Sequence, residues 1–313
     1  MALQKTTTAA LSSEMKTFYD KLLLERTVPL LLYSKFAQER PIPANGGKTI
    51  EFRKFDGIAT ATTPLTEGTP PSLKDLTMSA VTATVDQYGD AIGVSDLLST
   101  TTIDPILVEI TQILAEQAAE TIDELVRAVL VAGTTVLYAG AATSVGTITA
   151  ADILTPAEIR RAVLQLKLNR ARKIDGYYHA IIHPRTEHDL TGSDEWREAQ
   201  IYGNNAKGVF DGSLGTLYGV KFWVTDKAYT VADAGAGNVD QFSTIFLGQN
   251  AYASVKLSGH NLKTYHKPLG SAGTADPIDQ QQSFGWKVTF VTKILHDAFM
   301  LRLEHACSTA TNT

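Results

Sequence analysis

The sequence predicts an α+β fold, in which helices and strands are mixed along the chain without a regular strand–helix–strand order. A long segment, 104–132, has apolar residues at helical spacing. Segments 78–95 and 285–295 instead alternate between apolar and polar residues, as strands do. Hydrophobic residues make up 44% of the chain and charged residues 19%, which is typical of a folded globular protein.

Residues 1–45 are predicted to form an arm with two short apolar clusters on either side of Pro29. The first cluster has helical spacing, and the proline ends or kinks that helix. An arm this apolar needs a surface to lie on. That surface is either the body of the same chain or a neighbouring subunit, and the sequence leaves both open. The apolar side chains include Phe18, Leu22, Leu23, Leu31 and Phe36.

Two strands, 49–60 and 78–95, are predicted to pair as a long two-stranded hairpin. The segment between them is rich in Thr and Pro, which favours a turn at the tip. A two-stranded ribbon is only marginally stable alone in water. We therefore expect either the body of this chain or another chain to cover it.

The helix at 104–132 should begin at an Asp104 cap, with Pro105 in its first turn, and end at Gly133. About 28 residues at ~1.5 Å per residue give a rod of roughly 40 Å. A second helix should begin at Thr155, whose capping pattern includes Glu158, and run to about Lys173.

The second half of the chain is predicted to contain shorter elements. A polar helical segment is expected at 186–199 and a loop at 232–238. Strands are expected at 177–184, 220–226, 242–248, 285–295 and 297–306.

Composition argues against several classes of function. The net charge of −5 is unlike that of a protein that depends on gripping phosphates. The single cysteine, Cys307, excludes an intrachain disulfide and fits a reducing compartment. The uncharged run 128–151 is too rich in Gly, Ser and Thr for a membrane span, and residues 1–15 lack the apolar core of a signal peptide.

No motif predicts an active site, a cofactor or a metal. Gly46-Gly47-Lys48-Thr49 resembles the end of a phosphate-binding loop, but Ile42 occupies the place of the first glycine. His179 and His183 are four residues apart on a predicted strand, which is about 13 Å and too far to share one metal ion. His188 follows a proline and a predicted turn. We expect ordinary, partly buried histidines.

The order of parts resembles the Hong Kong 97 type fold of tailed-phage capsid proteins: an apolar arm, a long hairpin, a rod-like helix, a capped helix, a mixed module and returning strands. More closely, the chain is similar to the coat family that includes the phage N-four major capsid protein. The resemblance covers nearly the whole chain, and the segments that carry it are 42–58, 64–76, 84–96, 215–226 and 281–306.

The resemblance implies a major capsid protein that assembles into pentamers and hexamers of an icosahedral head around double-stranded DNA. It would work without a cofactor, in the virion, after assembly in the bacterial cytoplasm. Implied partners are copies of itself, the DNA through weak contacts, a portal, and decoration or scaffolding proteins. The implied regions are an N-terminal arm at 1–48, an extended loop at 49–100, a peripheral domain at 101–175, an axial domain at 176–275 and C-terminal strands at 276–313.

Contacts between subunits are expected in the arm and the loop. The candidate residues are Phe18, Leu22, Leu23, Leu31, Pro64, Leu65, Glu67, Pro70 and Leu73. The basic residues of the second helix would either face packaged DNA or, as we favour, form a solvated face that offsets the helix dipole. They are Arg160, Arg161, Lys167, Arg170 and Arg172. Two other functions stay open: the shell of an encapsulin-like bacterial compartment, and a soluble hydrolase with a site in 177–215.

Overall fold

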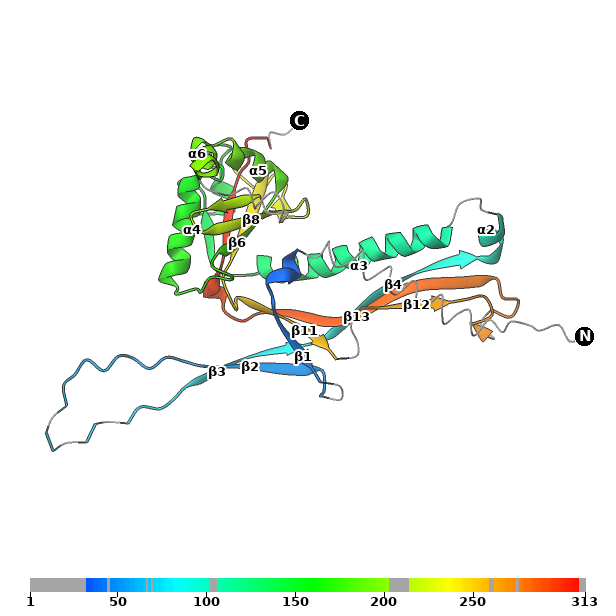
Figure 1. Ribbon diagram of the computed structural model, residues 1–313, viewed down its shortest axis with the longest axis horizontal. Helices are drawn as coiled ribbons and strands as arrows, with labels where there is room; N and C mark the ends of the chain where they lie inside the picture. Colours follow the sequence, from blue (N-terminus) through cyan, green and yellow to red (C-terminus); the bar gives the residue numbers. More distant parts are fainter. Residues whose placement is uncertain are drawn as a thin grey trace, which may run out of the picture.

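A long helix and a long strand run side by side through the body of the molecule (Figure 1). The helix is α3 (Ile106–Val131) and the strand is β13 (Gln281–Ile294). The buried residues of α3 recur every four positions, and those of β13 recur every second position, so each element turns one apolar face to the other. They are Leu114, Ala118, Val126 and Leu130 on α3, and Phe284, Trp286, Val288 and Phe290 on β13.

The computed structural model describes residues 32–43, 46–65, 67–68, 70–71, 73–101, 106–202, 214–258, 262–273 and 276–309. The apolar arm residues Phe18, Leu22, Leu23 and Leu31 lie outside this part of the chain, as do the predicted cap Asp104 and Pro105. The predicted helix is confirmed from Ile106 onward.

β13 is the centre of a five-stranded sheet. One edge of β13 pairs with β4 (Asp86–Ser95) along its N-terminal ten residues. Its other edge pairs with β12 (Lys263–Lys267) and then with β11 (Tyr252–Leu257), and β11 pairs in parallel with β1 (Gln38–Ile42). We call this five-stranded sheet, together with α3, the rod. The short helix α2 (Asp96–Thr101) follows β4 at the far end of the rod.

The predicted hairpin is confirmed in part. β2 (Thr49–Phe55) pairs with β3 (Met78–Thr84), and the described residues of 56–77 extend beyond them as a projecting loop (Figure 1). The prediction of one strand over 78–95 was wrong, because the chain changes sheets at Val85. This residue is buried with Ile42 and Val255, and after it β4 leaves the ribbon to pair with β13.

A seven-stranded sheet forms the raised module at the top of Figure 1. Its order is β5-β14-β10-β6-β8-β7, with β9 paired to β10. The strands are β5 (Val136–Tyr138), β6 (Tyr178–Ile182), β7 (Gly215–Leu217), β8 (Val220–Val224), β9 (Thr230–Val231), β10 (Gln241–Leu247) and β14 (Met300–His305). The strands predicted at 177–184, 220–226 and 242–248 are confirmed within one or two residues.

Helices cover both faces of this second sheet. Ala180 and Ile182 pack with α4 (Pro156–Leu168), whereas Ile181 between them packs with the C-terminal half of α3. The helix α3 therefore contributes to the cores of both sheets. The remaining elements are α5 (Pro184–Thr191), α6 (Asp194–Tyr202), η1 (Tyr33–Phe36), η2 (Val145–Thr147) and η5 (Asp297–Phe299).

The start of α4 is confirmed, because the Thr155 side chain accepts a hydrogen bond from the backbone N–H of Glu158. Its predicted end was wrong: the helix stops at Leu168, before Lys173. Arg170 adopts a left-handed φ of 57°, and Ala171 N–H bonds back to the carbonyl of Leu166, which closes the helix. The polar segment predicted to be helical at 186–199 is helical, and it forms two helices, α5 and α6.

Sheet membership does not follow continuous ranges of the sequence. β11 and β12 belong to the rod although they come between strands of the raised module, and β14 joins the raised module directly after β13. In the described part of the chain, no helix is long and apolar enough to span a bilayer.

The described part of the arm packs on its own body. Asp123 of α3 accepts hydrogen bonds from the backbone N–H groups of Leu32 and Tyr33, and the ring of Tyr33 is 1% exposed. The sequence left open whether the arm lies on its own chain or on a neighbour. For residues 32–42, the structure shows that the surface is the body of the same chain.

Candidate interaction surfaces

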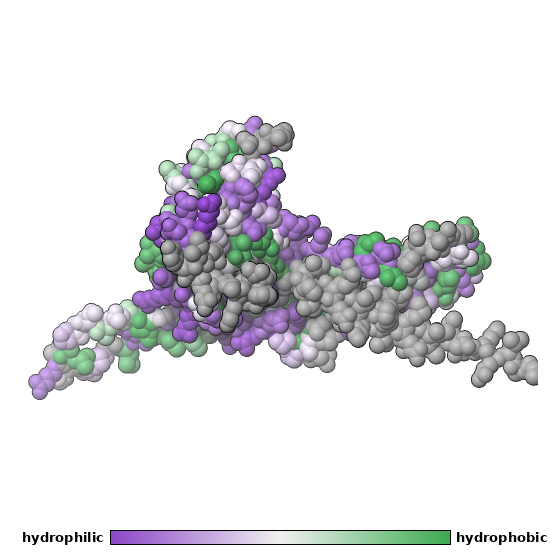
Figure 2. Space-filling view, turned by 45° about the horizontal axis from the view of Figure 1, so that its top comes forward, coloured by the Kyte–Doolittle hydropathy of each residue, from purple (hydrophilic) through white to green (hydrophobic). Residues whose placement is uncertain are grey.

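The projecting loop carries apolar side chains that nothing in the described chain covers. Leu73 is 98% exposed and Leu65 is 76% exposed, and green patches follow the loop in Figure 2. Burying one such side chain is worth about 1.5–3 kcal/mol, so the loop favours a partner. The other exposed apolar residues of the loop and its base are Phe55, Ile58, Leu76 and Met78. Pro64, Glu67 and Pro70 are exposed as well.

The rod offers a flat surface on the face turned away from α3, which we call the bare face. Side chains on one face of a strand alternate, and the exposed residues of β4 on this face are Gln87, Gly89, Ala91, Gly93 and Ser95. Their neighbours on β13 are Ser283, Gly285 and Lys287. An antiparallel sheet commonly packs one face on the core and leaves the other solvated. No described residue covers this face, and between its polar positions it carries the small residues Gly89, Ala91 and Gly93.

Lysines border the bare face on the side of β12. Lys263, Tyr265 and Lys267 point to the same side as Lys287, whose amino group lies 5.4 Å from the centre of the Tyr265 ring. The projecting loop has the opposite charge, because 56–77 contains the acidic residues Asp56, Glu67 and Asp75 but one lysine, Lys74. The two surfaces are therefore complementary in charge, and the loop also carries exposed apolar side chains.

Sequence reasoning found the loop but missed the bare face. The signal was present, since small residues occupy alternate positions from Gly89 to Ser95. A strand with small side chains on one face presents a surface that another chain can approach closely.

A third exposed apolar surface lies at the end of the rod opposite the loop. It is formed around α2 and the start of α3, and it is visible as green atoms at the right of Figure 2. Leu97 is 69% exposed, Ile113 54% and Ile278 71%. The molecule thus carries apolar surface at both ends of its long axis.

A cleft of about 470 Å³ separates the ribbon β2–β3 from the body at the root of the loop. Ile50 and Phe52 pack against the body on one side of the cleft. The basic residues Arg40, Arg53 and Lys54 also line it; Arg53 pairs with Glu51 at 3.0 Å and Lys54 with Asp56 at 3.9 Å. The ribbon therefore packs on the body through Ile50 and Phe52, and the cleft separates it from the body at Arg53 and Lys54.

The structure does not gather the five basic residues into one surface. Arg161 lies 3.3 Å from Glu158 and donates to the carbonyl of Tyr138, so it serves the fold of its own module. Arg160 lies over the ring of Tyr218, 5.5 Å from its centre. Lys167 is exposed near the end of α4, and Arg170 and Arg172 are exposed beyond it.

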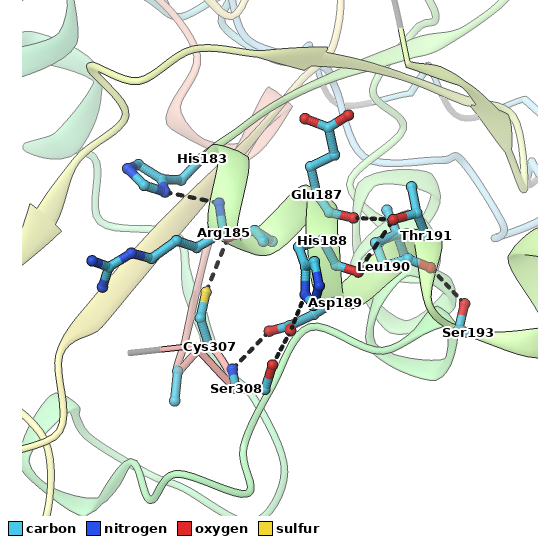
Figure 3. Close-up of polar contacts among 12 residues, drawn as sticks. His183, Arg185, Glu187, His188, Asp189, Leu190, Thr191, Ser193, Cys307 and Ser308 are labelled. Carbon is cyan, nitrogen blue, oxygen red and sulfur yellow. Dashed lines mark hydrogen bonds and ion pairs between the residues drawn. The ribbon is translucent and has the colours of Figure 1, made fainter. Parts of the chain in front are cut away.

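Figure 3 shows serine, histidine and aspartate side chains close together in the raised module, in the region of the hydrolase alternative. Both the backbone N–H and the hydroxyl of Ser308 donate to Asp189, and His188 Nδ1 lies 3.6 Å from the same carboxylate. The aspartate therefore lies between the serine and the histidine. A hydrolytic triad needs the histidine in the middle, where it can take the serine proton. This arrangement fastens the C-terminal segment to α5 instead.

The other candidate groups for chemistry also have structural roles. Burial raises the pKa of Cys307 to about 12, so its thiol is protonated at neutral pH. His179, on a strand as predicted, accepts a hydrogen bond from Trp223 Nε1 at 2.9 Å and stacks on Phe36. His183 accepts the backbone N–H of Arg185 at the start of α5 (Figure 3). The described residues contain no group of three His, Cys, Asp or Glu side chains placed to hold a metal.

Comparison with known proteins gives one matching family. The model of a family described as phage capsid protein matches residues 79–302, which is more than half of the chain. The match begins in β3 and ends in β14, so it includes α3, the bare face and most of both sheets, but not β1. No curated protein matches the chain.

Solved capsid structures have the same fold. The capsid of Ralstonia phage GP4 aligns with a TM-score of 0.70 at 16% identity, over 90% of each chain. The capsid of cyanophage Pam1 aligns with a TM-score of 0.70 at 14% identity, over 91% of this chain and 92% of that one. A virus-like particle from Pyrococcus furiosus aligns with a TM-score of 0.53 at 13% identity, over 93% and 99%. At these identities, the likeness concerns the fold.

Proposed function

Because this chain belongs to the phage capsid protein family, we propose that its projecting loop and bare face are the surfaces through which copies join into the shell of the head. The chain is a major capsid protein with the Hong Kong 97 type fold, and its role is structural. The observation that supports the proposal is the pair of surfaces described above. One is an apolar, acidic loop that no described residue covers, and the other is a flat face bordered by lysines.

In this arrangement, the loop of one copy lies on the bare face of the next. Leu65 and Leu73 would lose their contact with water, and Glu67 and Asp75 would approach the lysines of β12 and β13. The contact joins two different surfaces, so it is heterologous, and heterologous contacts that close produce rings. Such rings are the pentamers and hexamers of an icosahedral shell.

Several modest contacts are sufficient to hold each copy. Contacts at the loop, the bare face and the far end of the rod act together, because a copy held at one place is at high effective concentration at the others. The arm residues Phe18, Leu22, Leu23 and Leu31 would add a further contact with a neighbour.

We assign the rod with α3 to the peripheral domain and the raised module to the axial domain at the centres of rings. This assignment uses the two cores instead of continuous ranges, so α4, within 101–175, goes with the axial domain. β11 and β12, within 176–275, go with the peripheral domain.

The shell would enclose double-stranded DNA of a tailed phage and carry a portal, with decoration or scaffolding proteins as further partners. It would assemble in the cytoplasm of the host. The exposed cations Lys167, Arg170 and Arg172 allow weak contact with DNA, and the net charge of −5 keeps such contacts from holding it tightly. Purified particles that contain nucleic acid would support this proposal, whereas particles that enclose an enzyme would favour the encapsulin-like alternative.

Deleting residues 62–76 tests the loop. We expect a folded subunit, with unchanged circular dichroism, that no longer forms stable shells in electron micrographs. Replacing Leu65 and Leu73 with serine should have the same effect, and replacing Thr60 and Thr62 with serine in the same loop should have none. Shells of normal stability from the deleted chain would contradict the role given to the loop.

A further inference from the structure

The rod and the raised module are connected by two chain segments that bend at the same place. α3 and β13 run side by side toward the raised module, and then they turn at 132–135 and 295–299. They continue into that module as β5 and β14, which are parallel neighbours with Val136 opposite Arg302. We call these two bends, together with 248–251, the neck.

The carboxylate of Asp297 joins the two bends. Its Oδ1 accepts the backbone N–H of Thr134 at 2.9 Å, and its Oδ2 accepts the hydroxyl of Thr135 at 2.7 Å. The hydroxyl of Thr134 also donates to Oδ2. Burial alone would raise the pKa of Asp297, but these hydrogen bonds outweigh it and lower the pKa, so the carboxylate is ionised at neutral pH. Charged acceptors make the stronger hydrogen bonds.

The bends are packed closely around this carboxylate. A Cβ at Gly133 would lie 2.9 Å from Met300 Cε and 3.0 Å from Asp297 Oδ1, so the two segments approach as closely as a glycine allows. Arg302 makes a second connection, because its guanidinium donates to the carbonyl of Val131 at the end of α3. In the third segment, Gly248 N–H donates to the carbonyl of Phe299 at 2.9 Å.

We infer that Asp297 is a positioning residue that fixes the angle between the rod and the raised module, and through it the curvature of the shell. Without the carboxylate, the hydrogen bonds that Thr134 and Thr135 donate to it are lost, and the two bends are held less firmly, by Arg302 and by the pairing of β5 with β14. A copy contacts some neighbours through the rod and others through the raised module, so a variable angle changes the direction of every later contact. The inference rests on the proposed shell-forming function.

The test compares two aspartates with the same kind of hydrogen bonding. Asp189, like Asp297, accepts one backbone N–H and the hydroxyl of the same residue, in this case Ser308 (Figure 3). It lies on α5, at the top of the raised module and away from the neck (Figure 1). We would assemble Asp297→Ala and Asp189→Ala side by side, measuring melting temperature and the distribution of particle diameters by cryo-electron microscopy.

Both variants should melt at lower temperature, but Asp297→Ala alone should give a severalfold wider distribution of diameters or open, irregular shells. Uniform shells of normal diameter from Asp297→Ala would overturn the inference, and so would equally irregular shells from Asp189→Ala. If Asp297→Ala does not fold, Thr135→Val removes one donor and leaves the carboxylate, and it must still widen the distribution. Wild-type protein that forms no shells would contradict the assembly function itself, independently of Asp297.

Discussion

The carboxylate of Asp123, on α3, accepts the backbone N–H of Tyr33 at 2.7 Å, although the two residues are 90 positions apart in the chain. The N–H of Leu32 donates to the same oxygen at 3.1 Å, and the hydroxyl of Tyr252 donates to the carbonyl of Tyr33. A strand and a helix from distant parts of the chain therefore hold the point where the arm meets the body.

Replacing Asp123 with alanine should release this point. Two backbone N–H groups, one of them buried, would lose their acceptor, at a cost of about 1–3 kcal/mol for a buried donor. We expect a lower free energy of unfolding and faster amide hydrogen exchange at residues 32–37. Asp123→Asn keeps one acceptor oxygen and should lose less.

Glu120→Gln on the same helix provides the control, because Glu120 pairs with Lys227 at 3.4 Å on the exposed surface. Exposed pairs contribute about 0–1 kcal/mol. An effect as large as that of Asp123→Ala, or normal exchange at 32–37 in Asp123→Ala, would show that this carboxylate does not hold the arm.

Substitutions at two glycines of β4 should affect different properties, one the assembly of the shell and the other the stability of the subunit. A Cβ at Gly93 would meet nothing within 4 Å, so Gly93→Leu should change the free energy of unfolding by less than about 0.5 kcal/mol. Its side chain would stand on the bare face and block a neighbour. We therefore expect a folded subunit that fails to form shells in electron micrographs.

Gly89 gives the opposite expectation. A Cβ there would lie 2.5 Å from the carbonyl oxygen of Trp286, so Gly89→Ala should destabilise the subunit by about 1–3 kcal/mol through strain in β4 and β13. If Gly93→Leu assembles as well as the wild type, the bare face is not a contact surface.

The sequence predicted the elements whose patterns are local. The four-residue spacing of apolar residues in α3 and the capping residues Thr155 and Pro156 depend on neighbours in the chain, and both predictions were confirmed. The end of α4 was missed because it depends on Arg170 adopting a left-handed conformation, for which arginine has no intrinsic preference.

The pairing of strands from distant segments was harder to predict from the sequence. The residues of β12 are Lys, Thr, Tyr, His and Lys, and its lysines lie on one face. The pairing with β13 adds Lys287 to the same face, which the local sequence of β12 does not reveal. The division of 78–95 at Val85 is likewise decided by β13, which lies far along the chain. For the candidate site, the exposed loop was predicted from its composition. The small residues of β4 were visible in the sequence, but their neighbours on β13 and the contacts of the neck depend on the pairing of distant segments.

The thiol of Cys307 should be unreactive in the folded protein. The thiolate is the reactive form, and burial raises the pKa of Cys307 to about 12. Since this is the single cysteine of the chain, a thiol reagent such as a disulfide dye reports on it alone. We expect no reaction at pH 8 until denaturant unfolds the protein, and complete reaction afterwards. Rapid labelling of the native protein would contradict the packing of the C-terminal segment on α5.

His305 should make the subunit less stable in mild acid. Its ring is 0% exposed, its Nε2 lies 2.9 Å from the Thr244 hydroxyl, and burial lowers its pKa to about 4. In the unfolded chain the pKa of a histidine is about 6.5. Between these two values the unfolded chain binds more protons than the folded one, so the free energy of unfolding should decrease as the pH falls from about 6.5 to about 4.

The slope contributed by one such group approaches about 1.4 kcal/mol per pH unit. Burial also lowers the pKa of His179 and of His183, which act in the same direction, so the contribution of His305 must be isolated. Denaturant unfolding of the wild type and of His305→Gln at pH 7, 6, 5 and 4 does this. The stability advantage of the wild type should be largest at pH 7 and shrink steadily toward pH 4. An advantage that stays constant with pH would mean that His305 titrates normally and that water reaches the end of β14.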